Sequence, residues 1–189
     1  KANSSIPILS KNQSSESYET RKNWNHFWLI DTSDSEALAD KGSNCYTVNI
    51  ALIEDGFPFL GIVYIPARDV LYYSALDKGA YRVTGGDQPV RIKLSEADNI
   101  AITQVSKRNQ LSESTPIRNV SLSLCQAMEK IEQMPLVIES SWEWQTAAGH
   151  AFIRTLGYQL IDSASKHELR YNKVDWKNPK LVIKKKRPQ

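Results

Sequence analysis

Two carboxylates, Asp31 and Asp34, lie three residues apart and directly follow an apolar stretch of the chain. Carboxylate oxygens are the ligands that magnesium prefers in proteins, so such a pair at the end of a strand can hold this ion. Aspartate and serine are also common in ordinary turns, and Thr32 and Ser33 separate the two carboxylates. On spacing alone a plain turn is the better interpretation, and a metal site needs support from the rest of the chain.

The elements that would position these carboxylates are strands. Residues 24–30 are apolar and aromatic, and they predict a buried strand that ends at Asp31. Further strand signals, separated by short turns, follow at residues 46–53, 57–65, 70–74, 78–83 and 90–94. Because consecutive strands joined by short turns pair with their neighbours, these segments predict a largely antiparallel sheet.

The second half of the chain mixes helices with strands. Residues 122–131 and 146–156 have a helical pattern, and Gly157 would end the second helix. Residues 100–105 and 136–138 predict short strands, whereas residues 11–21 have no apolar period and predict a loop. A run of strands followed by helix, strand and helix is typical of a layered α/β (α+β) fold.

Motifs along the whole chain give the aspartate pair its context. They are IPILS at 6–10, WLIDTSDS at 28–35, TVNIAL at 47–52, LGIVYIPA at 60–67, EWQTAAGHA at 143–151 and LRYNK at 169–173. In this order they resemble the inositol monophosphatase superfamily, in particular the bacterial 3'(2'),5'-bisphosphate nucleotidases of the CysQ type. The resemblance implies a layered αβαβα sandwich. It also implies magnesium-dependent hydrolysis of a phosphate ester on a small metabolite, such as 3'-phosphoadenosine 5'-phosphate or an inositol phosphate.

The resemblance also implies roles for the residues of the aspartate segment. Asp31 and Asp34 match the catalytic aspartates that bind the metal, and the carbonyl of Ser33 matches a backbone ligand. Ser35 and Glu36 occupy the phosphate-binding positions, where the family has Gly-Thr. A carboxylate at Glu36 would repel a phosphate unless the side chain turns outward.

Three other ligand positions of the family carry different residues here. Lys11 and Asn12 replace two expected glutamates, and Gln145 replaces an expected aspartate. An ammonium group at Lys11 would repel a divalent ion or bind phosphate as a point charge, and Gln145 offers an oxygen without charge. Because magnesium demands near-octahedral oxygen coordination, these changes predict phosphatase activity that is weak or lost. The alternative is a non-catalytic pseudophosphatase that binds a phosphorylated small molecule or a partner subunit.

Other side chains are candidates for the same site. Arg170 and Asn172, within LRYNK, are possible substrate contacts. Glu139 and Glu143 could partly replace the lost carboxylates, although the default interpretation is that both are surface residues. His150 has no nucleophile beside it and is predicted to be packed rather than to act as a base. The five tryptophans are predicted to be mostly core aromatics rather than a stacking platform.

Length and composition limit these hypotheses. The 189 residues, 41% of them hydrophobic, suit one domain at 1–189, with a metal-loop and antiparallel-sheet half at about 1–98 and an α/β half at about 99–189. No apolar run approaches the ~20 residues that cross a bilayer. The two cysteines, Cys45 and Cys125, are predicted to be buried thiols, with a single disulfide between them as the alternative. Their number and spacing argue for a reducing compartment such as the cytoplasm and against zinc.

The net charge and the start of the sequence both bear on which partners the protein could bind. The net charge is +3, and the basic run at 184–187 is predicted to be a solvated tail rather than a nucleic-acid site, with contact to phospholipid at the inner membrane left open. The sequence lacks roughly the sixty N-terminal residues that would hold the family's first helices, and they are absent either from the protein or only from this sequence. Without them one face of the first sheet would be exposed or covered by a partner. A homodimer is possible.

Overall fold

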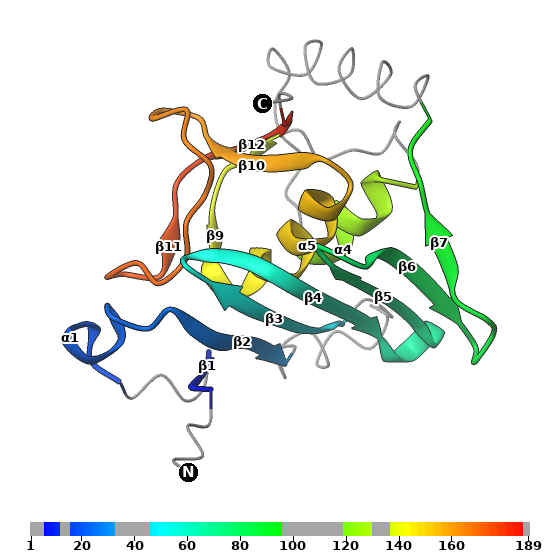
Figure 1. Ribbon diagram of the computed structural model, residues 1–189, viewed down its shortest axis with the longest axis horizontal. Coiled ribbons are helices and arrows are strands. Elements are labelled where there is room, and N and C mark those ends of the chain that lie inside the picture. The colour runs from blue at the N-terminus through cyan, green and yellow to red at the C-terminus, as the bar shows by residue number, and fades with distance from the viewer. Residues whose placement is uncertain (1–5, 12–15, 33–45, 96–118, 130–136, 187–189) are drawn as a thin grey trace.

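The computed structural model describes residues 6–11, 16–32, 46–95, 119–129 and 137–186. Figure 1 shows the helices α4 (Val120–Ala127) and α5 (Glu143–Thr155) between a large sheet and a smaller one. The large sheet has seven strands, the smaller one has three, and two further strands form a ribbon. The predicted α/β (α+β) class in layers is confirmed.

The seven-stranded sheet follows the order of the chain. Its first pair is parallel and its other neighbours are antiparallel, so the prediction of a largely antiparallel sheet is confirmed. Asp55 and Gly56, both with positive φ, make the tight turn between the third and fourth strands. The strands are β1 (Ile8–Ser10), β2 (His26–Thr32), β3 (Val48–Glu54), β4 (Phe57–Ile65), β5 (Val70–Ala75), β6 (Gly79–Thr84) and β7 (Val90–Ile92).

Helix α5 begins where the sequence supplies a capping side chain. The Trp142 N–H donates to Gln145 Oε1 at 2.9 Å, so the helix begins at Glu143 rather than at residue 146. The helix ends at Thr155, and Gly157, with a φ of 85°, turns the chain as predicted. No helix within the described residues is long and apolar enough to cross a bilayer.

Helix α4 overlaps the range predicted for it, 122–131, but begins two residues earlier and ends at Ala127. Asn119 precedes it and accepts the Leu122 N–H through Oδ1 at 3.0 Å, which satisfies a backbone donor of the first turn. Cys125 on this helix is a buried free thiol, as predicted, and its burial raises its pKa. Cys45 and the strand predicted at residues 100–105 lie outside the described residues.

The remaining strands come from the last third of the chain. The smaller sheet has the order β10, β12, β8, and β9 pairs with β11 in the ribbon. The prediction at 136–138 corresponds to β8, and the others were not predicted. Their bounds are β8 (Val137–Ile138), β9 (Ser141–Trp142), β10 (Tyr158–Asp162), β11 (Lys177–Asn178) and β12 (Leu181–Lys185).

Two segments differ from their predictions. Residues 11–21 do not form only a loop, because α1 (Tyr18–Arg21) begins after Ser17, whose Oγ accepts the Thr20 N–H at 3.3 Å. The basic run is also more than a tail, since Lys184 and Lys185 belong to β12 and pair with β10. The sheet orders the backbone of these two lysines. Their side chains are exposed, so the charges stay in water.

Small residues allow α5 to lie close to its neighbours. A Cβ at Gly61 of β4 would lie 2.3 Å from the Ala148 carbonyl oxygen, and a Cβ at Gly149 would lie 2.7 Å from the Ser121 Cα. The helix backbone therefore touches the sheet on one side and α4 on the other. This close packing sets the position of Gln145 at the start of α5 relative to the strands.

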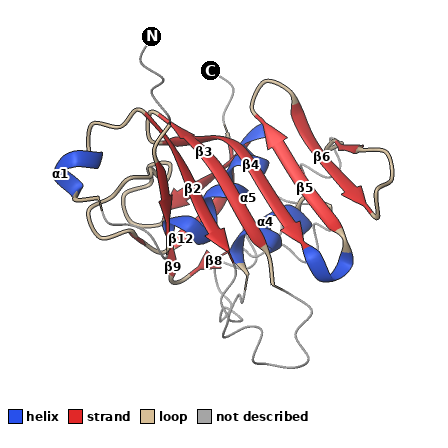
Figure 2. Cartoon of the chain, turned by 90° about the horizontal axis from the view of Figure 1, so that it is seen from below, coloured by secondary structure: helices blue, strands red, loops and turns tan. Residues whose placement is uncertain are grey.

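The other face of the seven-stranded sheet carries no helix among the described residues (Figure 2). The described elements thus form the β-α-β middle of the expected αβαβα sandwich. Half-buried apolar side chains lie opposite one another across the strands of this face. They form three rows, Trp28-Leu52-Leu60, Ile30-Ile50-Ile62-Tyr73-Tyr81 and Val48-Tyr64-Leu71-Val83.

Candidate functional site

Asp31 lies inside β2 rather than after it, because the strand extends to Thr32. It pairs with Asn49 of β3, whose Nδ2 donates to Asp31 Oδ2 at 3.5 Å. Asn49 is only 4% exposed, and its Oδ1 is buried without a hydrogen-bond partner. Sequence reasoning missed Asn49, although an amide in an otherwise apolar strand is an available signal. The predicted site residues Ser33, Asp34, Ser35 and Glu36 lie outside the described residues.

Lys11 follows directly after β1, at the edge of the same sheet. Ser10 lies opposite Ile30 in the parallel pair of β1 and β2. The next residues along the two chain segments are Lys11 and Asp31, so these two lie at the same height along the sheet. The Lys11 side chain is exposed. A positive charge thus stands at the strand position where the resemblance implies a metal-binding glutamate, and Asn12 lies outside the described residues.

Polar contacts join the first turns of the two central helices to the sheet. Asn119 Nδ2 donates to Thr47 Oγ1 at 2.5 Å, directly before β3. Ser121 Oγ donates to the Gln145 carbonyl oxygen at 2.8 Å and accepts the Gly149 N–H at 3.2 Å. The beginnings of α4 and α5 are therefore fixed side by side, and the described substituted positions lie at strand and helix ends.

The side-chain oxygen of Gln145 is already used within the helix. It accepts the backbone N–H of Trp142, which closes the first turn of α5. The predicted role of Gln145 as a neutral metal ligand would compete with this hydrogen bond. The role stays a prediction, but it now has a structural cost, because releasing the oxygen leaves a helix-terminal donor unsatisfied.

The described part of the site holds only some of the predicted metal donors. It supplies one carboxylate at Asp31, one neutral and unpaired oxygen at Asn49, and an ammonium group at Lys11. Within the described ranges no three His, Cys, Asp or Glu side chains gather closely enough to hold a metal ion. Magnesium takes hard, mostly anionic oxygen ligands in octahedral geometry, so these described groups alone carry too little negative charge to hold it, and the contribution of Asp34 stays a prediction.

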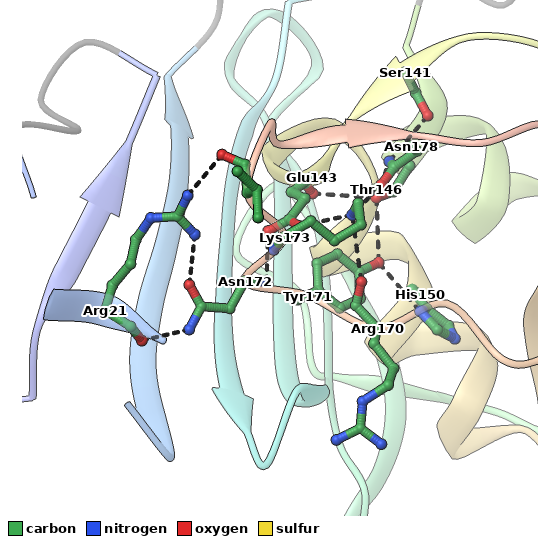
Figure 3. A network of polar contacts seen from close by, with 11 residues as sticks. Arg21, Ser141, Glu143, Thr146, His150, Arg170, Tyr171, Asn172, Lys173 and Asn178 are labelled. Atoms are coloured by element: carbon green, nitrogen blue, oxygen red, sulfur yellow. Dashed lines mark hydrogen bonds and ion pairs between the residues drawn. The ribbon is translucent and has the colours of Figure 1, made fainter. Parts of the chain in front are cut away.

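Glu143 was predicted by default to be a surface residue, and this is wrong. Its side chain is 0% exposed, and both of its oxygens are occupied (Figure 3). Oε2 accepts the Asn172 N–H at 2.8 Å, and Oε1 accepts the Lys173 N–H at 2.7 Å and Lys173 Nζ at 2.6 Å. Glu139 is exposed, as expected, and forms an ion pair with Lys180. Neither glutamate is available as a replacement ligand without breaking these contacts.

The possible substrate contacts Arg170 and Asn172 have different surroundings. Asn172 has a φ of 76°, donates from Nδ2 to the Arg21 carbonyl oxygen at 2.6 Å, and accepts Arg21 Nη1 at 2.7 Å (Figure 3). Arg170 is exposed, lies over the Phe57 ring and donates to the Asp55 carbonyl oxygen. Their role in substrate binding stays a prediction, and Arg21, which no sequence signal indicated, holds Asn172 in place.

His150 is a packed residue, as predicted. Its Nε2 accepts the Leu160 N–H at 3.2 Å and its Nδ1 lies 3.1 Å from the Tyr171 hydroxyl, which fits a neutral ring protonated at Nδ1. Burial lowers the pKa of His150, although Glu168 at 3.3 Å opposes this effect. Partial burial disfavours ionisation of Glu168, but contacts with His150 and Arg154 outweigh it and lower its pKa.

Comparison with known proteins extends the motif evidence to the whole chain. The model of the inositol monophosphatase family matches residues 3–188. The chain is 31% identical over 165 residues to the 3'(2'),5'-bisphosphate nucleotidase CysQ of Salmonella typhimurium, covering 83% of this chain and 67% of that protein. It is 33% identical over 162 residues to CysQ of Buchnera aphidicola, covering 80% of this chain and 60% of that protein. The chain thus spans only part of the length of these relatives.

Solved structures agree with the fold. The crystal structure of CysQ from Bacteroides thetaiotaomicron matches with a TM-score of 0.74 and 25% identity, over 98% of this chain and 79% of that one. The inositol monophosphate-bound SaIMPase-II matches with a TM-score of 0.63 at 16% identity, which shows a shared fold alone. Since the family match covers nearly all residues and includes the segments around Asp31 and Gln145, the chain belongs to the inositol monophosphatase family.

Proposed function

We propose that this chain is a divergent phosphomonoesterase of the CysQ type that binds a small phosphorylated metabolite, and that its magnesium-assisted hydrolysis is weak or lost. The observation that carries the proposal is the hydrogen bond from the Trp142 N–H to Gln145 Oε1 at 2.9 Å. It occupies one of the two lone pairs of the only side-chain oxygen of Gln145, the residue in place of the expected aspartate. Lys11 adds a positive charge at the sheet edge where a further carboxylate is expected.

The substrate class comes from the relatives. The CysQ proteins of Salmonella and Buchnera are 3'(2'),5'-bisphosphate nucleotidases, which favours adenosine 3',5'-bisphosphate over an inositol phosphate as the ligand. The non-catalytic alternative keeps the same ligand and loses only the hydrolysis. A reducing compartment such as the cytoplasm is part of the proposal, supported by Cys125 as a buried free thiol.

A phosphate-release assay tests the catalytic half of the proposal. Purified chain is incubated with adenosine 3',5'-bisphosphate or inositol 1-phosphate and magnesium, with and without lithium, beside Salmonella CysQ. Loss of even an outer-shell partner typically costs about 10–100-fold in metal affinity or activity, so loss of direct ligands should cost at least about 100-fold. Lithium-sensitive turnover at the rate of the Salmonella enzyme would show that the site is intact.

Metal binding can be measured without turnover. Because only a ligand bound to the native state raises stability, 10-fold excess magnesium should leave the melting temperature of the wild type unchanged. The double substitution Lys11→Glu with Gln145→Asp restores two carboxylates and should produce a magnesium-dependent rise. The control is Lys78→Glu with Gln88→Asp, which makes the same charge change at exposed positions and should give no rise. A rise in the wild type, or none in the restored variant, contradicts the assignment.

A further inference from the structure

Trp142 exposes a flat aromatic face directly before helix α5. The residue is 42% exposed and is therefore an exception among tryptophans that were expected to lie mostly in the core. The ring lies parallel to that of Trp144, with centroids 5.3 Å apart and an angle of 2° between the planes. One face of Trp142 is therefore covered by Trp144, and the exposure belongs to the remainder of the ring.

Further side chains hold this pair in position from behind. Trp144 packs against Trp176 with centroids 6.3 Å apart, and the Arg21 guanidinium lies 3.6 Å from the centre of the Trp176 ring. Arg21 is only 2% exposed, is fixed by Asn172 Oδ1, and also lies over Tyr18. The exposed tryptophan is thus the outer member of a stacked pair that rests on the tilted ring of Trp176, and a buried cation anchors the inner end of this group. Such backing lowers the entropy that a ligand must remove on binding.

The position of Trp142 links the stack to the candidate site. Its backbone N–H is bound to Gln145, and on the neighbouring strand it pairs with Lys177, whose side chain is exposed. An aromatic face, a cation and a helix N-terminus therefore occur within one turn of the residue that replaces a catalytic aspartate. This combination suits a molecule that carries both a planar ring and a phosphate.

We propose that the outer face of Trp142 stacks the base of a phosphorylated purine nucleoside. The proposal rests on the proposed function and narrows it, because it selects nucleotides over inositol phosphates. A purine presents a π-face to the indole, whereas inositol presents only hydroxyl groups and C–H bonds. Trp142 acts here as a specificity-determining residue and takes no part in the hydrolysis.

Calorimetric titration of the full chain with two ligands tests the assignment. Adenosine 3',5'-bisphosphate carries the base, and inositol 1-phosphate carries a phosphate without one. Stacking of one base on an aromatic side chain corresponds to about 5- to 150-fold in affinity, so Trp142→Ala should weaken nucleotide binding by that factor and leave inositol phosphate binding unchanged. Trp142→Phe should recover part of the loss, and its circular dichroism and melting curve show whether the fold is kept.

A matched control is available on the large sheet. Tyr73 and Tyr81 form another parallel pair, with centroids 5.2 Å apart, so Tyr81→Ala removes half of a stack away from the site and should change neither affinity. Equal nucleotide affinity in wild type and Trp142→Ala, or equal loss for both ligands, overturns the base-stacking role while phosphate binding stands. If the wild type binds neither ligand, the proposed function fails and the stacking role fails with it.

Discussion

The side-chain oxygen of Gln145 could bind a metal ion or cap helix α5, and in the structure it accepts the hydrogen bond that caps the helix. A glutamine at the third position of a helix completes a capping arrangement, as a glutamate does, by accepting the N–H before the first turn. The uncharged amide therefore preserves the start of α5 while it removes a negative charge from the candidate site. The geometry of the helix can be kept even where metal binding is lost.

The buried side chain of His150 should make the free energy of unfolding depend on pH. Its folded-state pKa lies below the ordinary value of about 6.5, because the ring is buried and Nε2 accepts a backbone N–H. The unfolded chain then binds more protons between the two pKa values, so the free energy of unfolding falls as the pH falls through this window. Urea unfolding from pH 7.5 to 5 should show this loss, at most about 1.4 kcal/mol per pH unit for one proton.

The charged neighbours of His150 define the control. Glu168, Arg154 and Tyr171 surround the ring. The Glu168 carboxylate favours protonation of the ring, whereas Arg154, which binds the same carboxylate oxygen at 2.7 Å, disfavours it. His150→Gln should remove the His150 part of the pH dependence, whereas His167→Gln, at an exposed position, should not. An unchanged slope in His150→Gln would mean that the pKa of His150 is the same in the folded and unfolded protein, which contradicts its lowering by burial.

At the scale of elements, the contact between β4 and α5 depends on Gly61. A methyl group there would lie 2.3 Å from the Ala148 carbonyl oxygen and 2.7 Å from the Ala151 Cβ, so the helix would have to move away from the sheet. Gly61→Ala should therefore lower the free energy of unfolding by about 1–3 kcal/mol, the usual cost of overpacking. Urea unfolding followed by circular dichroism measures it.

The residue opposite Gly61 provides the matched control. Ser74 pairs with Gly61 across the sheet, and its buried hydroxyl has no hydrogen-bond partner. Ser74→Ala adds no atoms and removes an unsatisfied polar group, so it should be neutral or stabilising. If both substitutions had the same effect, the helix could not be as close to the sheet as the structure has it.

The short helix α1 is joined to the C-terminal part of the chain by Arg21. Its guanidinium donates to Asn172 Oδ1 at 2.7 Å and to the Val174 carbonyl oxygen at 2.9 Å, and it lies on the Trp176 ring. A lysine cannot reproduce this fork, so Arg21→Lys should cost about 1.5–3 kcal/mol. Hydrogen exchange should show lost protection in α1 and in residues 172–176.

The neighbouring Lys22 separates this contact from a general effect of charge. It is exposed and paired only with Glu19 among the ion pairs given by the described residues. Lys22→Ala should therefore cost less than about 1 kcal/mol. Arg21→Lys with unchanged exchange in residues 172–176 would show that α1 is held by other contacts.

At the scale of the whole molecule, the two faces of the large sheet are unequal. Val63, 1% exposed, lies two residues after Gly61 and therefore on the face that packs against α5, while its neighbour Ile62 is half-buried on the opposite face. Burying a hydroxyl without a partner costs about 1–3 kcal/mol, so Val63→Thr should destabilise by that amount. Ile62→Thr should cost about 1 kcal/mol or less, and equal costs in urea unfolding would mean that both faces are covered.

The apolar rows of that face also predict association. Exposed apolar patches of several strands commonly bind other chains, and a homodimer is one outcome that fits the expectation from the sequence. Light scattering on a sizing column should show species larger than the monomer, and Ile62→Lys should reduce them. A monodisperse monomer at high concentration in the wild type would remove this reason for expecting a partner.

The sequence by itself was enough for the strand meander, the two central helices and the family. These features depend on local patterns: alternating apolar residues and turn residues for β3 to β6, helical spacing with Gly157 for α5, and motifs in a fixed order. Strands β10, β11 and β12 were not predicted. The domain division near residue 98 and the roles of residues 33–36, which lie outside the described residues, stay predictions.

Only the tertiary structure decided how the polar side chains of the site are used. Glu143 is buried because Asn172 and Lys173 bring their N–H groups to it, and Asn172 is fixed by Arg21, which is 151 positions away in the sequence. Trp142 is exposed because Trp144 covers just one face of its ring. Sequence patterns report which residues share a local period. Hydrogen bonds and stacking between distant segments follow from the packing of the whole chain, so no local pattern contains them.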